Sequence, residues 1–231
     1  MMIIANWKMY LTHDEQIAFC RNNYATLATI PPETLVLCPS FTALAPIATL
    51  LKDTAVSVGA QHCSAMAQGA FTGQVDAQSL AQIGCRYSLV GHSECRSYLG
   101  VNDTVVAQTI GQLLAVGITP IVCIGETADE RDAGKTYNAI DRQMNMLDRQ
   151  TWASCLVAYE PRWAIGSGAT PTLEEIALIS SYIHKKTGTR VLYGGSVTSA
   201  NAHDLRAVGT IAGLLVGTAS TDFQELKKIV S

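Results

Sequence analysis

The sequence lacks an excess of positive charge. It has 16 Lys and Arg residues against 19 Asp and Glu residues, a formal net charge of −3, and only 15% of its 231 residues are charged. Binding to nucleic acid or to an anionic membrane depends on a basic surface, which this composition does not provide. We therefore expect a small-molecule partner, and neither nucleic acid nor a membrane.

Long apolar runs are absent as well. The longest mostly apolar stretch, LLAVGITPIVCIG, contains Gly and Pro and is shorter than the roughly 20 residues that a membrane-spanning helix needs. The N-terminal segment MMIIANWKMY has no basic region and no small-residue cleavage site, and its apolar part stops at Asn6. We expect a soluble, cytoplasmic protein.

Cysteine pairs with metal-binding spacing are missing too. The seven cysteines include no Cys-x-x-Cys pair, and their odd number does not suit a disulfide framework. We expect reduced thiols and no metal site.

No low-complexity tract or Pro/Ser-rich linker divides the chain, so a single domain over residues 1–231 is predicted.

What the sequence does contain is a recurrent pattern of short β-branched or aliphatic runs. Between them lie segments with helical spacing, such as 104–117 and 172–186, the second opening with a Thr-x-x-Glu capping box. Apolar strands alternating with amphipathic helices indicate a parallel sheet with covered faces, and eight units indicate an α/β fold closed into a (β/α)8 TIM barrel. A doubly wound open sheet is the alternative, although no Gly-x-Gly-x-x-Gly follows the first run. The runs are 3–7, 35–39, 56–60, 87–91, 120–124, 156–160, 190–194 and 213–217.

Polar residues follow these runs, at the ends where the βα loops of a barrel gather around one axis. Asn6 and Lys8 are two apart, so both are expected on the same side of an extended strand. His92 precedes a helical turn whose N–H groups would favour the neutral imidazole. Glycine pairs are usually simple turns, but in barrels the loops after strands seven and eight often bind phosphate. The predicted site comprises Asn6, Lys8, Gln61, His92, Glu94, Glu160, the Gly-Gly-Ser at 194–196, Gly217 and Thr218.

Seven motifs occur in order along the whole chain: ANWKM, GAFTG, CRYSLVGHSE, CIGET, AYEPRWAIGSG, YGGSV and LVGTAS. Together they resemble the triosephosphate isomerase family. The resemblance implies cofactor-free interconversion of dihydroxyacetone phosphate and D-glyceraldehyde 3-phosphate in glycolysis and gluconeogenesis. Glu160 would be the general base and neutral His92 the electrophile, with Lys8 as a fixed positive charge and Asn6 as a hydrogen-bond donor.

The resemblance also implies a phosphate site and a lid. Backbone N–H groups of Gly166, Ser196, Gly217 and Thr218 would hold phosphate, with the Ser196 hydroxyl as a further donor. The segment 161–171 would close over it, with 161–163 and 169–171 as hinges, and keep water from the enediol phosphate. Ile165 and Leu215 would clamp the Glu160 carboxylate.

Several positions depart from the family pattern. Cys95, Gln74 and Val101 stand where the family has a charged cluster near the subunit contact, so we expect that an ion-pair network was replaced as a unit. The loop from His62 to Gly73 still resembles the family's dimer-forming arm and predicts a homodimer. Thr218 replaces a glycine, and a β-branched residue is expected to resist a positive φ there.

Three other functions fit parts of this pattern. A Schiff-base aldolase would use Lys8, which would have to be unprotonated in a desolvating pocket. A non-catalytic sensor of phosphorylated metabolites could share the fold, but it would need no base and electrophile facing each other. A purely structural oligomer would leave the polar strand ends unexplained.

Overall fold

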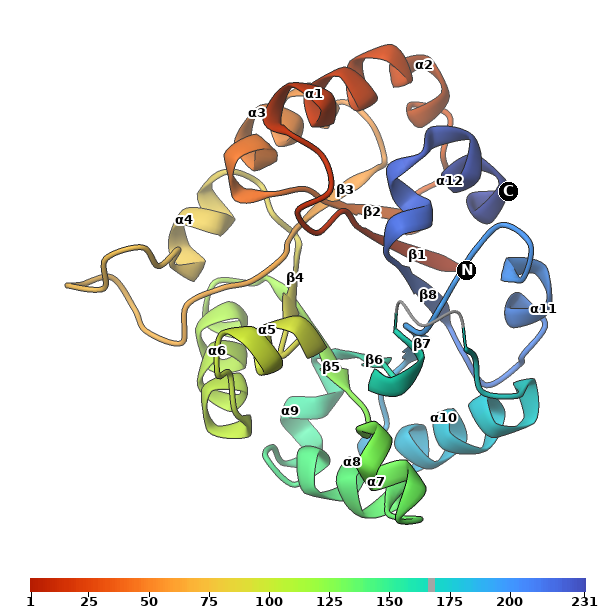
Figure 1. Cartoon of the computed structure of the whole chain (residues 1–231). Coiled ribbons are helices and arrows are strands. Elements are labelled where there is room, and N and C mark those ends of the chain that lie inside the picture. Colours follow the sequence, from red (N-terminus) through yellow and green to blue (C-terminus); the bar gives the residue numbers. More distant parts are fainter. Residues whose placement is uncertain (166–168) are drawn as a thin grey trace.

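A closed barrel of parallel strands forms the centre of the computed structural model, which describes residues 1–165 and 169–231 (Figure 1). Each strand pairs with the next in the chain, and the last pairs with the first, so that Ile3 stands opposite both Leu35 and Leu214. The predicted (β/α)8 class is confirmed, and the open sheet is wrong. The strands are β1 Met2–Asn6, β2 Leu35–Cys38, β3 Ser57–Ala60, β4 Tyr87–Val90, β5 Thr119–Ile124, β6 Leu156–Tyr159, β7 Val191–Tyr193 and β8 Gly213–Val216.

Helices surround the barrel on its outside (Figure 1). The capping box at Thr172 and Glu175 is present and starts α10, as its sequence pattern predicts. The helices are α1 His13–Asn22, α2 Tyr24–Leu27, α3 Phe41–Leu51, α4 Ala77–Gln82, α5 Ser93–Tyr98, α6 Asp103–Ala115, α7 Ala128–Asp132, α8 Thr136–Met144, α9 Arg149–Ala153, α10 Leu173–Thr187, α11 Ala202–Arg206 and α12 Phe223–Val230. The described residues also form the 3₁₀ helices η1 Arg162–Ala164 and η2 Thr218–Thr221, which follow strands β6 and β8.

The apolar core has two layers, because successive side chains of a strand point to opposite faces. In β1, Ile3 and Ala5 belong to the layer between strands and helices, whereas Met2 and Ile4 belong to a smaller cluster with Leu89, Ile121, Leu192 and Leu215. Both layers are buried, which explains why the strands read as continuous apolar runs rather than as alternating ones. The polar residues of the predicted site lie at or beyond the carboxyl ends of the strands, whereas Ser88 lies buried within β4.

The seven cysteines are free, and all except the half-buried Cys95 are buried. Burial raises the pKa of both Cys20 and Cys155 to about 12. Within the described residues, no helix is both long and apolar enough to cross a membrane.

Candidate active site

A cavity of about 570 Å³ opens at the carboxyl ends of the strands and brings together residues from β1, β4, β6, β7 and β8. Of the predicted site residues, Gln61 and Glu94 lie outside its lining, and Gly166 lies outside the described residues. The others all line this one cavity: Asn6, Lys8, His92, Glu160, Ile165, Ser196, Leu215, Gly217 and Thr218. The topology of the barrel therefore gathers side chains that are up to 212 positions apart in the chain (6 to 218).

Glu160 and His92 are in direct contact inside this cavity. Glu160 Oε1 lies 3.3 Å from His92 Nε2, and the Glu160 side chain is only 3% exposed. Its second oxygen accepts a hydrogen bond of 3.3 Å from the backbone N–H of Ser93. Both contacts are long for hydrogen bonds and therefore weak. Glycine at 194 permits this placement, because a Cβ there would stand 2.9 Å from Glu160 Cγ.

His92 is the N-cap residue of α5, and this position fixes its ring. Its Nδ1 accepts a hydrogen bond of 3.2 Å from the backbone N–H of Glu94. An accepting Nδ1 carries a lone pair, so the neutral ring has its proton on Nε2, the atom that faces Glu160. The short path from β4 to α5 thus directs His92 Nε2 toward Glu160 in the cavity.

Lys8 does not lie in a strand, contrary to the sequence-based expectation. Strand β1 ends at Asn6, and Lys8 follows in a turn with a φ of 50°, so the alternation of an extended chain does not place it. A left-handed non-glycine residue costs on the order of 1–2 kcal/mol. The Lys8 side chain is 16% exposed, and its Nζ forms an ion pair of 2.6 Å with Glu94 Oε1. Asn6 Oδ1 accepts from the Lys8 backbone N–H at 3.1 Å.

Two distant residues hold the Lys8 turn in place. Gln61, which follows β3, donates from Nε2 to the carbonyls of Lys8 at 2.8 Å and Cys38 at 2.9 Å. Trp7 is fully buried and donates from Nε1 to the carbonyl of Ser220 at 3.0 Å. The strained turn is therefore supported from both β3 and η2, which is typical of strain at a functional site.

The expected phosphate site lies at the ends of β7 and β8. Gly217 is the N-cap residue of η2, and both Gly217 and Thr218 line the cavity after β8. The expected strain at Thr218 is wrong: among the described non-glycine residues only Lys8 and Glu33 have a positive φ. Thr218 instead starts η2 with helical geometry, which accommodates a β-branched side chain. The Ser196 hydroxyl donates to the carbonyl of Ala164 at 2.6 Å rather than into the cavity.

The sequence-based reasoning missed Glu126, a fully buried carboxylate after β5. Glu126 Oε1 accepts a hydrogen bond of 2.9 Å from Trp163 Nε1, within the first predicted hinge, and the Tyr159 hydroxyl donates to the same carboxylate at 3.3 Å. Burial raises the pKa of Glu126. Arg131 lies 4.1 Å from the Trp163 ring and pairs with Glu175 at 2.7 Å. The available signal was an acidic residue close to the carboxyl end of an apolar strand, a pattern similar to the one that marked Glu160.

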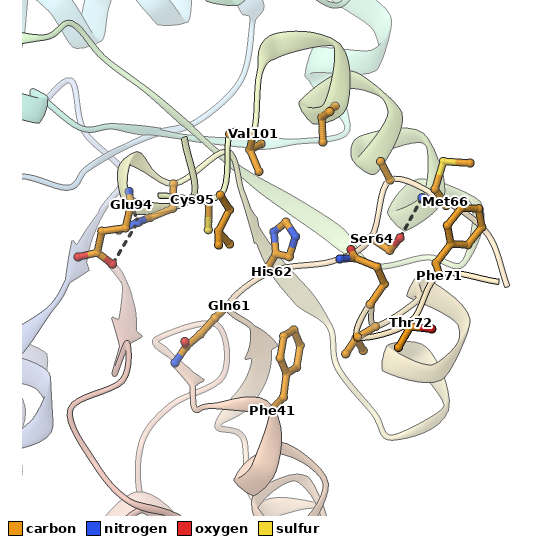
Figure 2. A pocket seen from close by; sticks show the side chains of 18 of the residues that line it. Phe41, Gln61, His62, Ser64, Met66, Phe71, Thr72, Glu94, Cys95 and Val101 are labelled. Atoms are coloured by element: carbon orange, nitrogen blue, oxygen red, sulfur yellow. Dashed lines mark hydrogen bonds and ion pairs between the residues drawn. The ribbon is translucent and has the colours of Figure 1, made fainter. Parts of the chain in front are cut away.

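A second and larger cavity of about 850 Å³ adjoins the first, and Asn6, Lys8 and His92 line both. It also receives Glu94 and the three neutral replacements Cys95, Gln74 and Val101. Figure 2 shows its lining, with Phe41, Met66 and Phe71 around a half-buried His62. The structure thus brings the three departures from the family pattern to one place, where a charge would face mostly apolar and neutral groups.

A carboxylate and an imidazole in contact, with a lysine in the same cavity at the carboxyl end of a parallel barrel, are the groups of an acid–base enzyme. The whole chain, residues 1–231, matches the family model described as triosephosphate isomerase. Relatives named triosephosphate isomerase include those of Chloroflexus aurantiacus and Aquifex aeolicus, which are each 38% identical to this chain over 99% of its length, and the match covers 97% and 98% of these relatives, respectively. The relative from Bordetella pertussis is 40% identical over 100% of this chain and 96% of the relative. The chain belongs to the triosephosphate isomerase family.

Proposed function

We propose that this chain interconverts dihydroxyacetone phosphate and D-glyceraldehyde 3-phosphate by proton transfer through an enediolate, as an isomerase of glycolysis and gluconeogenesis. The observation that carries the proposal is the 3.3 Å contact between Glu160 Oε1 and His92 Nε2 within the cavity that Lys8 also lines. We propose the cytoplasm as its location, where glycolytic intermediates are found.

Glu160 is the base in this proposal, and His92 is the hydrogen-bond donor to the reacting oxygens. Removing a proton next to a carbonyl leaves negative charge on oxygen, so base and electrophile must both reach the substrate. In the described structure the two groups touch each other and do not flank a space. Glu160 must therefore exchange its contacts with His92 and Ser93 for the substrate, and since both contacts are 3.3 Å long, the exchange costs little.

The remaining roles follow from position. Lys8 supplies positive charge to the developing oxyanion, and Asn6 is the neighbouring donor, since its oxygen already accepts from the Lys8 backbone. Phosphate binds to backbone N–H groups at Ser196, Gly217 and Thr218, with η2 adding the positive end of its short dipole. Ile165 and Leu215 line the cavity as apolar neighbours that limit access of water to Glu160. These steps require no metal or organic cofactor.

The activity test is an assay of the two triose phosphates without added cofactor. We expect Glu160→Gln to lower kcat by about 10²- to 10⁴-fold, because it replaces the base by an amide of the same shape. The matched control is Glu174→Gln, an exposed glutamate on α10, which should retain wild-type kcat. A wild-type protein that leaves both triose phosphates unchanged would refute the proposal, and so would a fully active Glu160→Gln variant.

We further propose that a second copy of this chain covers the larger cavity. The segment 62–75 extends away from the barrel before α4 (Figure 1) and contains no Asp, Glu, Lys or Arg. Large apolar side chains are exposed at the cavity, including Phe41, Met66, Phe71 and Leu99, and Met9, which follows Lys8 in the chain, is 93% exposed. An uncharged arm matches a partly apolar cavity in which the two charged residues, Lys8 and Glu94, already pair with each other.

Sedimentation with activity measurements tests this homodimer. Phe71→Glu should produce monomers of reduced activity, because Lys8 and His92 would lose the cover of the adjoining cavity. Leu178→Glu is the control, since Leu178 is 56% exposed on α10, away from this cavity. A wild-type protein that is fully active as a monomer would contradict the proposal.

A further inference from the structure

Helix α5 carries three groups of the candidate site in its first turn. His92 caps the helix, the Ser93 backbone N–H donates to Glu160, and the Glu94 side chain pairs with Lys8. The helix has only 6 residues, so its own hydrogen bonds fix its position weakly. A group outside the helix backbone must hold this turn against β4.

Arg96 contacts this turn from two directions. Its backbone N–H donates to the His92 carbonyl at 3.0 Å, and its side-chain Nε donates to the Gly91 carbonyl at 2.8 Å. Arg96 Nη1 also forms an ion pair of 2.7 Å with Asp103, the first residue of α6, and the Arg96 side chain is only 12% exposed. One residue therefore binds the carbonyls of two consecutive residues, Gly91 and His92.

The link at Gly91 is conformationally demanding. Gly91 has a φ of 67°, and a Cβ there would stand 2.7 Å from Val106 and 3.0 Å from Arg96 Nη2. A residue with such freedom adopts many conformations unless its neighbours restrict it. The hydrogen bond from Arg96 Nε restricts the orientation of the Gly91 carbonyl, and with it the direction in which His92 leaves the strand.

We propose that Arg96 is a positioning residue, whose Nε–H···O bond to Gly91 sets the direction in which His92 faces Glu160. This inference rests on the proposed isomerase function. Arg96 does not position His92 through its charge, because that charge is already paired with Asp103. Within the described residues, Arg96 Nη2 is buried without a hydrogen-bond partner, a cost that an apolar residue filling this space would avoid. The guanidinium is thus explained by its two directional bonds and not by packing.

The alternative is that Arg96 only ties α5 to α6 through Asp103. Two substitutions separate these roles. In Arg96→Gln the amide nitrogen occupies the place of Nε and still donates to Gly91, whereas in Arg96→Met a methyl group occupies it. Both variants lose the ion pair equally, so each is made together with Asp103→Asn, which leaves no unpaired carboxylate behind.

Kinetics of the isomerisation and the ¹⁵N chemical shifts of the His92 ring provide the readouts. We expect the kcat of the Gln variant to stay within about threefold of that of Asp103→Asn alone. The Met variant should lose about 10- to 100-fold in kcat relative to the same reference, with KM changed less than threefold, because small displacements of catalytic groups have effects of this size. The His92 shifts should move only in the Met variant. Equal kcat values for the Gln and Met variants would overturn the inference.

A fallback variant and two outcomes separate a failure of the inference on Arg96 from a failure of the proposed function. If the Met variant does not fold, Arg96→Leu takes its place, because leucine has no hydrogen-bond donor for the Gly91 carbonyl; the same criterion for kcat then applies. If the wild-type protein is an active isomerase and the Gln and Met variants are alike, the inference on Arg96 fails alone. If the wild-type protein is inactive on triose phosphates, the proposed function fails first.

Discussion

Cys95→Arg is the substitution for which the structure gives the clearest quantitative expectation. Cys95 is half-buried in the larger cavity beside Gln74 and Val101, and the carboxylate next to it, Glu94, is already paired with Lys8 at 2.6 Å. A guanidinium placed there finds no free acidic partner within the cavity lining. Breaking a fully buried ion pair costs about 3–5 kcal/mol. Partial exposure reduces this, so we expect Cys95→Arg to lower the free energy of unfolding by about 1–3 kcal/mol.

The assay is urea unfolding, followed by circular dichroism at several protein concentrations, since association adds to apparent stability. For a chain of this size 1 kcal/mol corresponds to roughly 2–4 °C in Tm, which makes the effect measurable by thermal unfolding as well. Cys95→Ser is the control, because it changes the side chain without adding charge.

The combination of Cys95→Arg with Gln74→Glu and Val101→Glu tests the physical reason. If the three positions act as one unit, the two carboxylates should restore at least half of the lost stability. An unchanged unfolding free energy in Cys95→Arg would refute the reasoning, and a triple variant no more stable than the single one would do so too.

Three other expectations address separate parts of the site. Ile165→Ala should lower kcat about tenfold, equivalent to ~1.4 kcal/mol, because Ile165 lines the cavity together with Glu160. The stability should change little, because Ile165 is only partly buried. An unchanged kcat in steady-state kinetics would contradict this expectation. Glu126→Gln should flatten the dependence of the unfolding free energy on pH. Burial raises the pKa of Glu126 above 4.5, so the carboxyl group contributes most to stability below pH 4.5. This contribution is lost as the pH rises through the raised pKa. Urea unfolding from pH 4 to 8 measures it, and equal slopes for wild type and variant would oppose the argument. Thr218→Gly should leave KM within about twofold and lower the free energy of unfolding by about 0.4–1 kcal/mol, because Thr218 already has a negative φ. A large gain in substrate affinity would show that reasoning wrong.

The sequence was sufficient to predict the barrel, because its signals are local and repeated. Each apolar run became a strand, and the Thr172–Glu175 capping box started a helix where expected. The convergence of His92 and Glu160 also followed from topology, since all strand ends of a parallel barrel meet at one face. The family resemblance added their chemical roles.

What the sequence did not predict depends on contacts between distant segments. The turn at Lys8 is held by Gln61, which follows a different strand, so extended geometry was the wrong assumption there. The role of Glu126 depends on Trp163, which is 37 positions away. Thr218 was expected to be strained because glycine is usual in the family, but the start of η2 gives it an ordinary φ. Local patterns contain none of this information.

The ion pair between Lys8 and Glu94 bears on how an anion reaches the cavity. With its charge matched at 2.6 Å, Lys8 presents a dipole to distant solvent, and the field of a dipole decays faster with distance than that of a charge. The chain as a whole carries a net charge of −3, which repels a phosphorylated molecule at long range. Capture of the anion therefore relies on short-range hydrogen bonds, and added salt should alter the association rate far less than in enzymes that attract their ligands through a basic funnel.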